Sequence, residues 1–301
     1  MNNNLKANKK RELMEYIAER WFLFNALIAI ISVAAIAFFV FYKGMQPFFP
    51  GNEFGTTSFI DFISKSEWRP GKGLFGIFYM IVGSILATTG AIAIGVPIAI
   101  LTAVFIAEIA PDNIKKIVKP AVELLAGIPS VLYGVFGLGV IVPYINSISP
   151  MPQGESLLAV IIVLAVMILP TVITISESAI NAVPDSFREG SYGLGASKIQ
   201  TIFKVVLPAA RSGILAGVVL GIGRAIGETM AVILVAGNPI TGIPSNIWQA
   251  IRPLTTNIAL EMSYAAELHQ QMLFSTGVVL FFFIIIINLV LNKITSSMDE
   301  D

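Results

Sequence analysis

The chain has 301 residues, of which 55% are hydrophobic and only 13% are charged, and its mean hydropathy is +0.81. Soluble domains carry about 25% charged residues, so this composition predicts a polytopic membrane protein. The net charge is zero and no basic patch interleaves with aromatics, which argues against a nucleic-acid partner. There is no cysteine and one histidine, His269, which we expect to be an interfacial residue. No metal or other cofactor is therefore expected.

The first apolar run covers residues 21–42 and follows a charged segment, residues 1–20, that is expected to form a helical tail. The run supplies about the 20 apolar residues that a helix needs to cross a bilayer. A secretory signal has a shorter apolar region followed by small residues at a cleavage site. The sequence "FFVFYKG" at the end of this run offers no such site. We therefore expect a retained first span, followed by an outer loop that reaches residue 74.

Five more apolar runs are each long enough to cross a bilayer as a helix. They lie at about Phe75–Ala107, Ala121–Val142, Leu157–Ser176, Ser212–Ala236 and Gln271–Leu291. The sequence thus predicts an all-α fold with six transmembrane helices, a core membrane domain over residues 75–291 and a C-terminal tail over residues 292–301. The second run is too long for one straight crossing, and Gly95 with Pro97 predict a break within it.

The basic residues predict which side of the membrane the termini face. Six spans place both termini on one side, and most of the 19 lysines and arginines lie in the segments of that side. By the positive-inside rule this side is cytoplasmic. The opposite side carries fewer basic residues, which are Lys43, Lys65, Arg69, Lys72 and Arg252. One cation, Arg224, falls inside a span.

The fifth apolar run carries two charges on a face of small residues. At 100° per residue, Gly213, Gly217, Gly221, Arg224 and Glu228 fall on one side of a helix, and the other side is apolar. Glycines let another helix approach closely, and a charge at mid-bilayer costs about 3 kcal/mol unless it faces protein or water. We expect this face to line a solute path. The alternative is a structural ion pair between Arg224 and Glu228, four residues apart.

The segment between the fourth and fifth runs, residues 184–208, is too long and too amphipathic to be a simple connector. Pro184 is expected to start a short helix, which Gly193 and Gly195 would end. The stretch that follows reads as a second short helix stopped by Pro208. A helix–glycine–helix element with an apolar face at the cytoplasmic surface predicts either burial or a protein partner.

This segment resembles the loop E-A-A-x3-G-x9-I-x-L-P of permeases from binding-protein-dependent ABC importers. Glu189, Gly195, Leu207 and Pro208 occupy the Glu, Gly, Leu and Pro positions, while Gly-Ser replaces Ala-Ala and Val replaces Ile. The resemblance implies a type I importer permease fold in which this loop is the coupling helix that docks on a cytoplasmic ATPase. The chain has no G-x-x-x-x-G-K-[ST] phosphate loop, so another chain would bind and hydrolyse the ATP.

Four further motifs are similar to those of phosphate-importer permeases. They are "AVELLAGIPSVLYGVFGLG", "VMILPT", "VVLPAARSGILAG" and "GRAIGETMAVILVAGN". The resemblance implies a non-catalytic permease of a prokaryotic cell membrane that moves inorganic phosphate by alternating access. Its implied partners are a second permease subunit, cytoplasmic ATP-binding subunits and an extracytoplasmic phosphate-binding protein. In this family the intramembrane Arg and Glu, here Arg224 and Glu228, are implicated in phosphate passage, and a guanidinium suits phosphate because of its planar donors.

Other functions remain open on the sequence alone. A permease for another oxyanion, such as sulfate, molybdate or a phosphonate, would also use an arginine. A secondary transporter or channel would need repeat symmetry, broken helices or a filter sequence, and would leave the coupling loop unexplained. An intramembrane enzyme would need a catalytic motif, and neither H-E-x-x-H nor G-x-S-x-G occurs in the chain.

Overall fold

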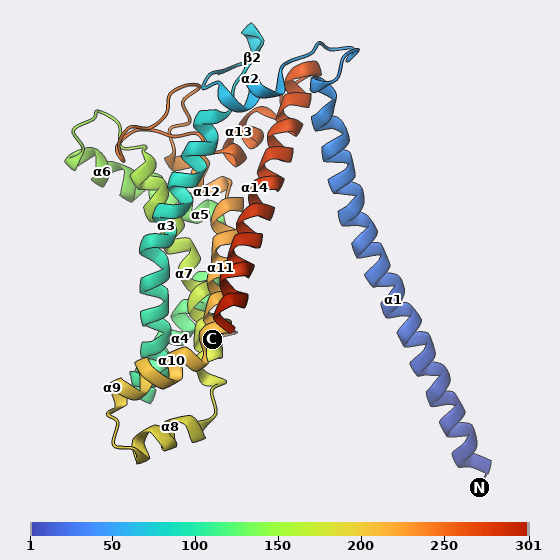
Figure 1. The fold of residues 1–301 in the computed structure, drawn as a ribbon, viewed down its shortest axis with the longest axis vertical. Coiled ribbons are helices and arrows are strands. Elements are labelled where there is room, and N and C mark those ends of the chain that lie inside the picture. The colour runs from blue at the N-terminus through green and yellow to red at the C-terminus, as the bar shows by residue number, and fades with distance from the viewer. Residues whose placement is uncertain (1, 300–301) are drawn as a thin grey trace.

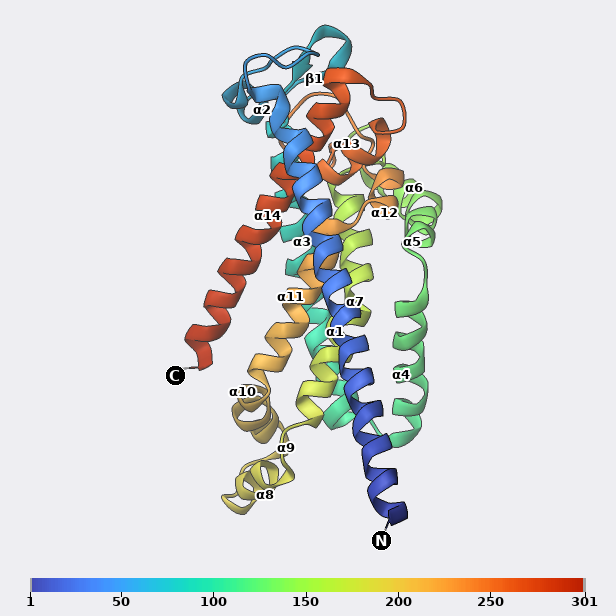
Figure 2. The same ribbon diagram turned by 90° about the vertical axis from the view of Figure 1, so that its right-hand side faces the viewer.

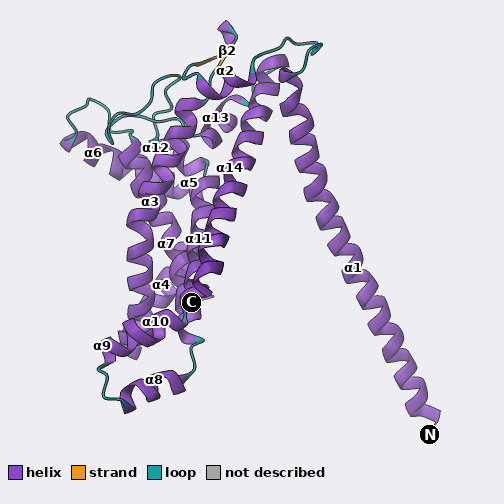
Figure 3. Cartoon of the chain, viewed as in Figure 1, coloured by secondary structure: helices purple, strands orange, loops and turns teal. Residues whose placement is uncertain are grey.

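The computed structural model describes residues 2–299 and is built almost entirely of helices (Figures 1 and 3). Its only sheet within these residues is a small antiparallel hairpin of β1 (Trp68–Arg69) and β2 (Leu74–Phe75). The predicted all-α membrane fold is confirmed. We call the end of the bundle that carries the hairpin the outer end, and the end where the chain starts the inner end (Figure 1).

Helix α1 (Asn2–Met45) is one continuous helix of 44 residues, with no break between the charged tail and the first span. It packs against α14 (Glu267–Asp299) near the outer end, where Phe39 lies edge-on to Phe274. From there α1 diverges from the bundle toward the inner end (Figure 1). Its apolar residues, including Trp21, are consequently exposed along most of its length.

Helix α7 (Leu157–Asn181) forms the centre of the bundle and packs against both α3 (Phe78–Val104) and α11 (Arg211–Gly227). Helix α3 continues through Gly95 and Pro97 and ends in a π-helical turn, η3 (Phe105–Ile109). The predicted break at these two residues is therefore wrong. The reason is packing, because a Cβ at Gly95 would lie only 2.8 Å from Ile168 of α7, so the glycine lets two intact helices touch.

The third apolar run is broken, which contradicts the single span expected over residues 121–142. Helix α4 (Asp112–Gly127) ends before Pro129, and the chain resumes as α5 (Ser130–Phe136). The π-helical turn η4 (Gly137–Ile141) and α6 (Val142–Ile148) then continue at the outer end (Figure 2). A residue before proline is driven into extended backbone, as Ile128 is, and this ends the helix. The hydroxyl of Tyr133 donates to the Leu125 carbonyl at 2.7 Å and so caps the freed end of α4.

The fifth apolar run is also broken, so the continuous helix expected over residues 212–236 is wrong. Helix α11 ends at Gly227, Glu228 is extended, and α12 (Met230–Val235) begins two residues later. At the inner end, α11 is bent by 70° from the helical segment Lys198–Ala209. Among the described residues, five helices are long and apolar enough to cross a membrane, or six if this bent pair is one span.

The outer end is closed by short elements on an apolar cluster. These elements are η1 (Gln46–Phe48), α2 (Phe59–Ser64), the β1–β2 hairpin with η2 (Pro70–Lys72), and α13 (Leu254–Glu261) (Figure 2). The cluster contains Phe62, Trp68, Phe75, Ile77, Tyr79, Met80, Leu254, Met272 and Leu273. The outer cap thus joins segments from both ends of the sequence.

The inner end carries the segment that the sequence singled out. It consists of α8 (Asp185–Gly193), α9 (Lys198–Thr201), the π-helical turn η5 (Ile202–Val206) and α10 (Leu207–Ala209). As expected, α8 begins directly after Pro184, and Gly195 forms the turn with a φ of +84°. The second helical segment ends at Ala209, one residue after Pro208, where the chain bends by 70° into α11, so the stop expected at Pro208 is confirmed to within one residue.

The glycines of α11 bring it into close contact with α7. A Cβ at Gly217 would lie 3.1 Å from Ile175, one at Gly221 would lie 2.7 Å from Val172, and one at Gly213 would overlap the Cβ of Ala179. Gly223, on the same helix, has no atom within 4 Å of such a Cβ. The packing of α11 on α7 therefore depends on the first three glycines and not on the fourth.

We expect Gly213→Ala to lower the stability of the detergent-solubilised protein by about 1–3 kcal/mol, because the new methyl group overlaps a Cβ that cannot rotate away. Gly223→Ala is the matched control and should leave stability unchanged or raise it by up to about 1 kcal/mol, the helix propensity of alanine over glycine. Thermal unfolding of the two variants measures the difference. Equal stabilities would contradict the role given to Gly213.

Candidate functional site

Arg224 lies in the last turn of α11 and is only partly buried. Its Nη1 donates to the Thr171 hydroxyl of α7 at 3.2 Å. Gly223 and Gly227, beside it on α11, are exposed, and nothing lies within 4 Å of a Cβ at either position. Arg224 therefore stands at an edge of α11 that the rest of this chain leaves open.

Glu228 does not pair with Arg224, contrary to the i,i+4 pairing considered from the sequence. The helix ends at Gly227, so the spacing of four residues no longer places the two side chains on one face. The carboxylate of Glu228 instead accepts from the Ala231 backbone N–H at 2.9 Å, and its carbonyl accepts from the Thr255 hydroxyl at 3.0 Å. No ion pair joins Arg224 to Glu228 among the described residues. Glu228 thus provides an acceptor for a backbone N–H in the first turn of α12, and its own carbonyl connects the break between α11 and α12 to α13.

Glu228 also borders a small internal cavity between α3, α7, α11 and α13. Its polar lining includes Ser84, Thr88, Glu228 and Thr255, and its volume is about 10 Å³. A space of this size holds about one water molecule. The cavity at Glu228 is therefore too small for any solute much larger than water.

A strip of polar and small residues follows this open edge. Thr171 of α7 lies there with Gly223, Arg224 and Gly227 of α11, and we call these four residues the open strip. Polar groups and a guanidinium facing hydrocarbon are costly. The open strip therefore requires either water or the surface of another protein.

The predicted coupling residues lie together at the inner end, around an exposed apolar surface. Glu189 is exposed on α8, Gly195 forms the turn, and Leu207 with Pro208 lies in the short helix α10. The exposed apolar side chains of this segment are Phe187, Tyr192, Leu194, Ile199 and Phe203. Leu194 is 91% exposed. This amount of uncovered apolar surface on a short segment is typical of a protein-binding site.

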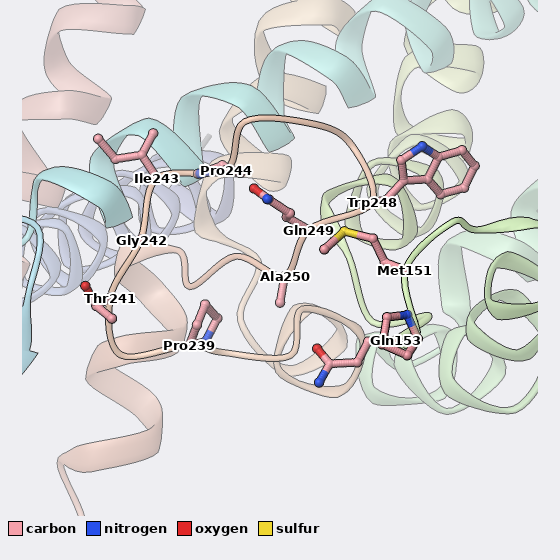
Figure 4. A pocket seen from close by; sticks show the side chains of 11 residues that line it. Met151, Gln153, Pro239, Thr241, Gly242, Ile243, Pro244, Trp248, Gln249 and Ala250 are labelled. Carbon is pink, nitrogen blue, oxygen red and sulfur yellow. The ribbon is translucent and has the colours of Figure 1, made fainter.

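Two shallow grooves lie at the two ends of the bundle. One, of about 470 Å³, is lined by residues of α8 and η5, including Phe187, Leu194 and Val205. The other, of about 450 Å³, lies at the outer end under the loop that contains Gly242, Pro244 and Trp248 (Figure 4). The side chains of Met151 and Gln153 border this second groove. Neither groove includes a residue of the open strip.

The structure also shows a buried charged cluster that the sequence did not predict. Glu261 of α13 accepts from Trp68 Nε1 at 2.7 Å, bonds His269 Nε2 at 2.7 Å and pairs with Arg252. Arg252 and Glu261 are only 3% and 5% exposed. His269, expected at the membrane interface, and Arg252, expected as a loop charge, are thus both partners of a carboxylate. The four residues come from four separate segments, so no local pattern could pair them.

Metal binding has no candidate site in the part of the chain that the structure describes. No group of three or more histidine, aspartate or glutamate residues is arranged to hold an ion. The chemistry that the site offers is therefore that of one guanidinium with hydroxyls and small residues along an open helix edge.

Comparison with known proteins agrees with these features. Residues 95–299 match the family described as "Binding-protein-dependent transport system inner membrane component". The probable ABC transporter permease protein YqgH of Bacillus subtilis is 40% identical over 291 residues, 94% of this chain and 93% of the relative. The phosphate transport system permease protein PstC is 33% identical in Pasteurella multocida, over 76% of this chain and 77% of that protein. In Mesorhizobium japonicum PstC is 32% identical, over 85% and 82%.

Solved structures share the fold. The match with a bacterial ABC transporter involved in alginate import covers 95% of this chain and 99% of the transporter chain, with a TM-score of 0.64 at 18% identity. The MetNI methionine ABC transporter, solved in inward facing conformations, covers 74% and 94% with a TM-score of 0.56 at 19% identity. The resemblance drawn from the coupling loop is confirmed. This chain belongs to the inner-membrane component family of binding-protein-dependent transport systems, the permease subunits of ABC importers.

Proposed function

We propose that this chain is a PstC-like permease subunit of an ATP-driven importer of inorganic phosphate. The observation that carries the proposal is the position of Arg224, a partly exposed guanidinium in the last turn of a membrane helix, on an edge that its own chain leaves open. A guanidinium remains charged at all physiological pH values and offers a planar set of donors that matches phosphate oxygens. The relatives named PstC favour phosphate over sulfate, molybdate or a phosphonate as the transported oxyanion.

Arg224 would contact the anion together with Thr171, whose hydroxyl already lies 3.2 Å from its Nη1. A single guanidinium with one hydroxyl makes a weak site. Weak binding suits a permease, because the ion has to leave as readily as it enters. Most of the affinity would come from a PstS-like phosphate-binding protein that docks on the outer end, where the groove under Trp248 lies.

A second, PstA-like permease subunit would cover the open strip and complete the path. The strip is polar, and nothing in this chain covers Gly223 or Gly227. The neighbouring face of α11, with Gly213, Gly217 and Gly221, is already packed against α7. The phosphate path would then run between the two permeases, with Arg224 as this chain's cation on it.

Glu228 would act at the break rather than as a partner of Arg224. Its carboxylate holds the first turn of α12 and its carbonyl is tied to α13 through Thr255. A break with satisfied backbone groups can change its angle without leaving bare N–H and C=O groups in the membrane. In alternating access, this hinge would let the outer end open while α11 stays packed on α7.

PstB-like ATPase subunits would bind the exposed apolar surface around α8, with Glu189, Gly195, Leu207 and Pro208 in the coupling segment. This chain would be non-catalytic, since its sequence contains no phosphate loop for ATP. The inner end and both termini would be cytoplasmic, in agreement with the excess of lysine and arginine there.

We expect Arg224→Gln to abolish ATP-dependent phosphate uptake into vesicles that hold the complete complex, because the path loses its cation. ATP hydrolysis stimulated by the loaded binding protein should persist. Arg211→Gln, at the other end of the same helix, is the control and should transport normally. Normal uptake by Arg224→Gln would refute the role of Arg224, and uptake of sulfate or molybdate instead of phosphate by the wild type would refute the substrate.

We expect Leu194→Asp to weaken binding of the ATPase subunits by about 10-fold to 100-fold, the loss that follows from no longer burying one leucine side chain. Ile60→Asp is the control, since Ile60 is 74% exposed but lies at the outer end. Co-purification of the ATPase subunits from solubilised membranes measures the effect. Equal recovery with both variants would contradict the assignment of this surface.

A further inference from the structure

Helix α8 has little contact with the membrane helices apart from one side chain. None of its residues is buried. Ser191 bonds the Thr201 hydroxyl at 2.9 Å, but Thr201 belongs to the same inner segment. Among the described residues, every side-chain hydrogen bond and ion pair from α8 to α7, to the residues directly after α7, or to η3 at the end of α3 involves Arg188.

Arg188 uses all five of its N–H donors. Nε and Nη2 both donate to Glu108 of η3, at 3.0 and 2.6 Å. Nη2 also donates to the Ile180 carbonyl at 3.0 Å, and Nη1 donates to the Val183 carbonyl at 2.6 Å. The remaining bond, from Nη1 to Asp185 at 3.3 Å, lies within α8. Arg188 therefore joins α8 to the inner ends of both α3 and α7.

The ion pair between Arg188 and Glu108 is largely buried, so water screens it little. The side chain of Arg188 is 16% exposed and that of Glu108 is 9% exposed. The carbonyl of Ile180 is in the last turn of α7 and that of Val183 lies two residues beyond the helix, at a helix C-terminus where positive charge is favoured. A lysine could not replace this arrangement, because its three donors share one atom and cannot form a planar fork.

The second half of the inner segment is anchored differently. Ile202 and Val206 of η5 are buried in an apolar cluster with Ile180, Val183 and Ile106. Apolar contacts of this kind resist separation but have no fixed direction, whereas a five-bond guanidinium fixes both distance and angle. The orientation of α8 relative to α3 and α7 therefore depends on Arg188.

We propose that Arg188 is the positioning residue through which movement of α8 is transmitted to α3 and α7. The inference rests on the proposed import function and deepens it. When the ATPase subunits move α8, the fork to Glu108 and the two carbonyls makes the inner ends of α3 and α7 move with it as one body. Without the fork, α8 follows the ATPase while the membrane helices follow only partly, so ATP is hydrolysed with less transport.

The first experiment measures phosphate imported per ATP hydrolysed in vesicles that hold the complete complex. We expect Arg188→Lys to lower this ratio by about tenfold, since it loses several charge-assisted hydrogen bonds. The assembled complex and its ATP hydrolysis should remain. Arg211→Lys is the matched control, because Arg211 lies at the same end and forms no hydrogen bond or ion pair with the residues that the structure describes. Glu108→Gln should lower the ratio less, in the same direction.

A second readout does not depend on the transported solute. The chain has no cysteine, so Ser186→Cys on α8 and Leu101→Cys on α3 can carry a pair of spin labels. We expect a narrow distance distribution that is the same with and without trapped nucleotide, and a broad one in Arg188→Lys. Arg211→Lys should match the wild type.

An unchanged transport ratio together with an unchanged distance distribution in Arg188→Lys would overturn the inference. If Arg188→Lys does not assemble, Glu108→Gln decides by the same two measurements. A wild-type complex that imports no phosphate would refute the proposed substrate instead, and the spin-label distances would still decide the role of Arg188.

Discussion

The structure depends on one constraint, that every backbone N–H and C=O group inside a bilayer needs a partner within the protein. This chain breaks its helices in several places, and at three helix ends a side chain bonds the backbone groups. Tyr133 caps the end of α4, Glu228 accepts from the first turn of α12, and Arg188 binds a carbonyl in the last turn of α7 and one just beyond it. These helix breaks are thus stabilised by specific side chains, and two of these side chains, Glu228 and Arg188, have roles in the proposed mechanism. If a helix moves at one of these breaks and the capping side chain moves with it, the backbone N–H and C=O groups keep their hydrogen-bond partners.

Glycines determine which faces of α3 and α11 pack against α7 and which face of α11 is left open. Gly95 of α3 and Gly217 of α11 bring their helices against α7, where added methyl groups would collide. A Cβ added at Gly223 or Gly227 of α11 would meet no atom of the described residues within 4 Å. One helix therefore carries both a fixed face and an open face, and Arg224 lies at their boundary. A solute path at this boundary would be lined on one side by the packed helices α7 and α11 and on the other side by a second subunit.

The sequence predicted what depends on local patterns. Hydropathy identified the membrane segments, and the motif around Glu189 and Gly195 predicted a helix–turn–helix at the inner end, which the structure contains. The sequence failed where tertiary contacts override helical periodicity. A helical projection of residues 212–236 assumes an unbroken helix. It therefore placed Arg224 and Glu228 on one face, although the helix ends between them. The partners of Glu261 lie up to 193 residues away, and pairing them requires the fold itself.

The length of α1 has a mechanical consequence. At 1.5 Å per residue, the charged residues 2–20 extend the helix by about 28 Å beyond its apolar part, because no break separates the two. The contacts of this helix with α14 lie near its other end, so in the absence of a further partner it would act as a lever with its pivot at the outer surface. A tilt of about 10° at the pivot would move the far end of the helix by about 12 Å, over its full length of about 66 Å. A probe attached there would magnify small angular changes of the bundle into displacements that fluorescence can resolve.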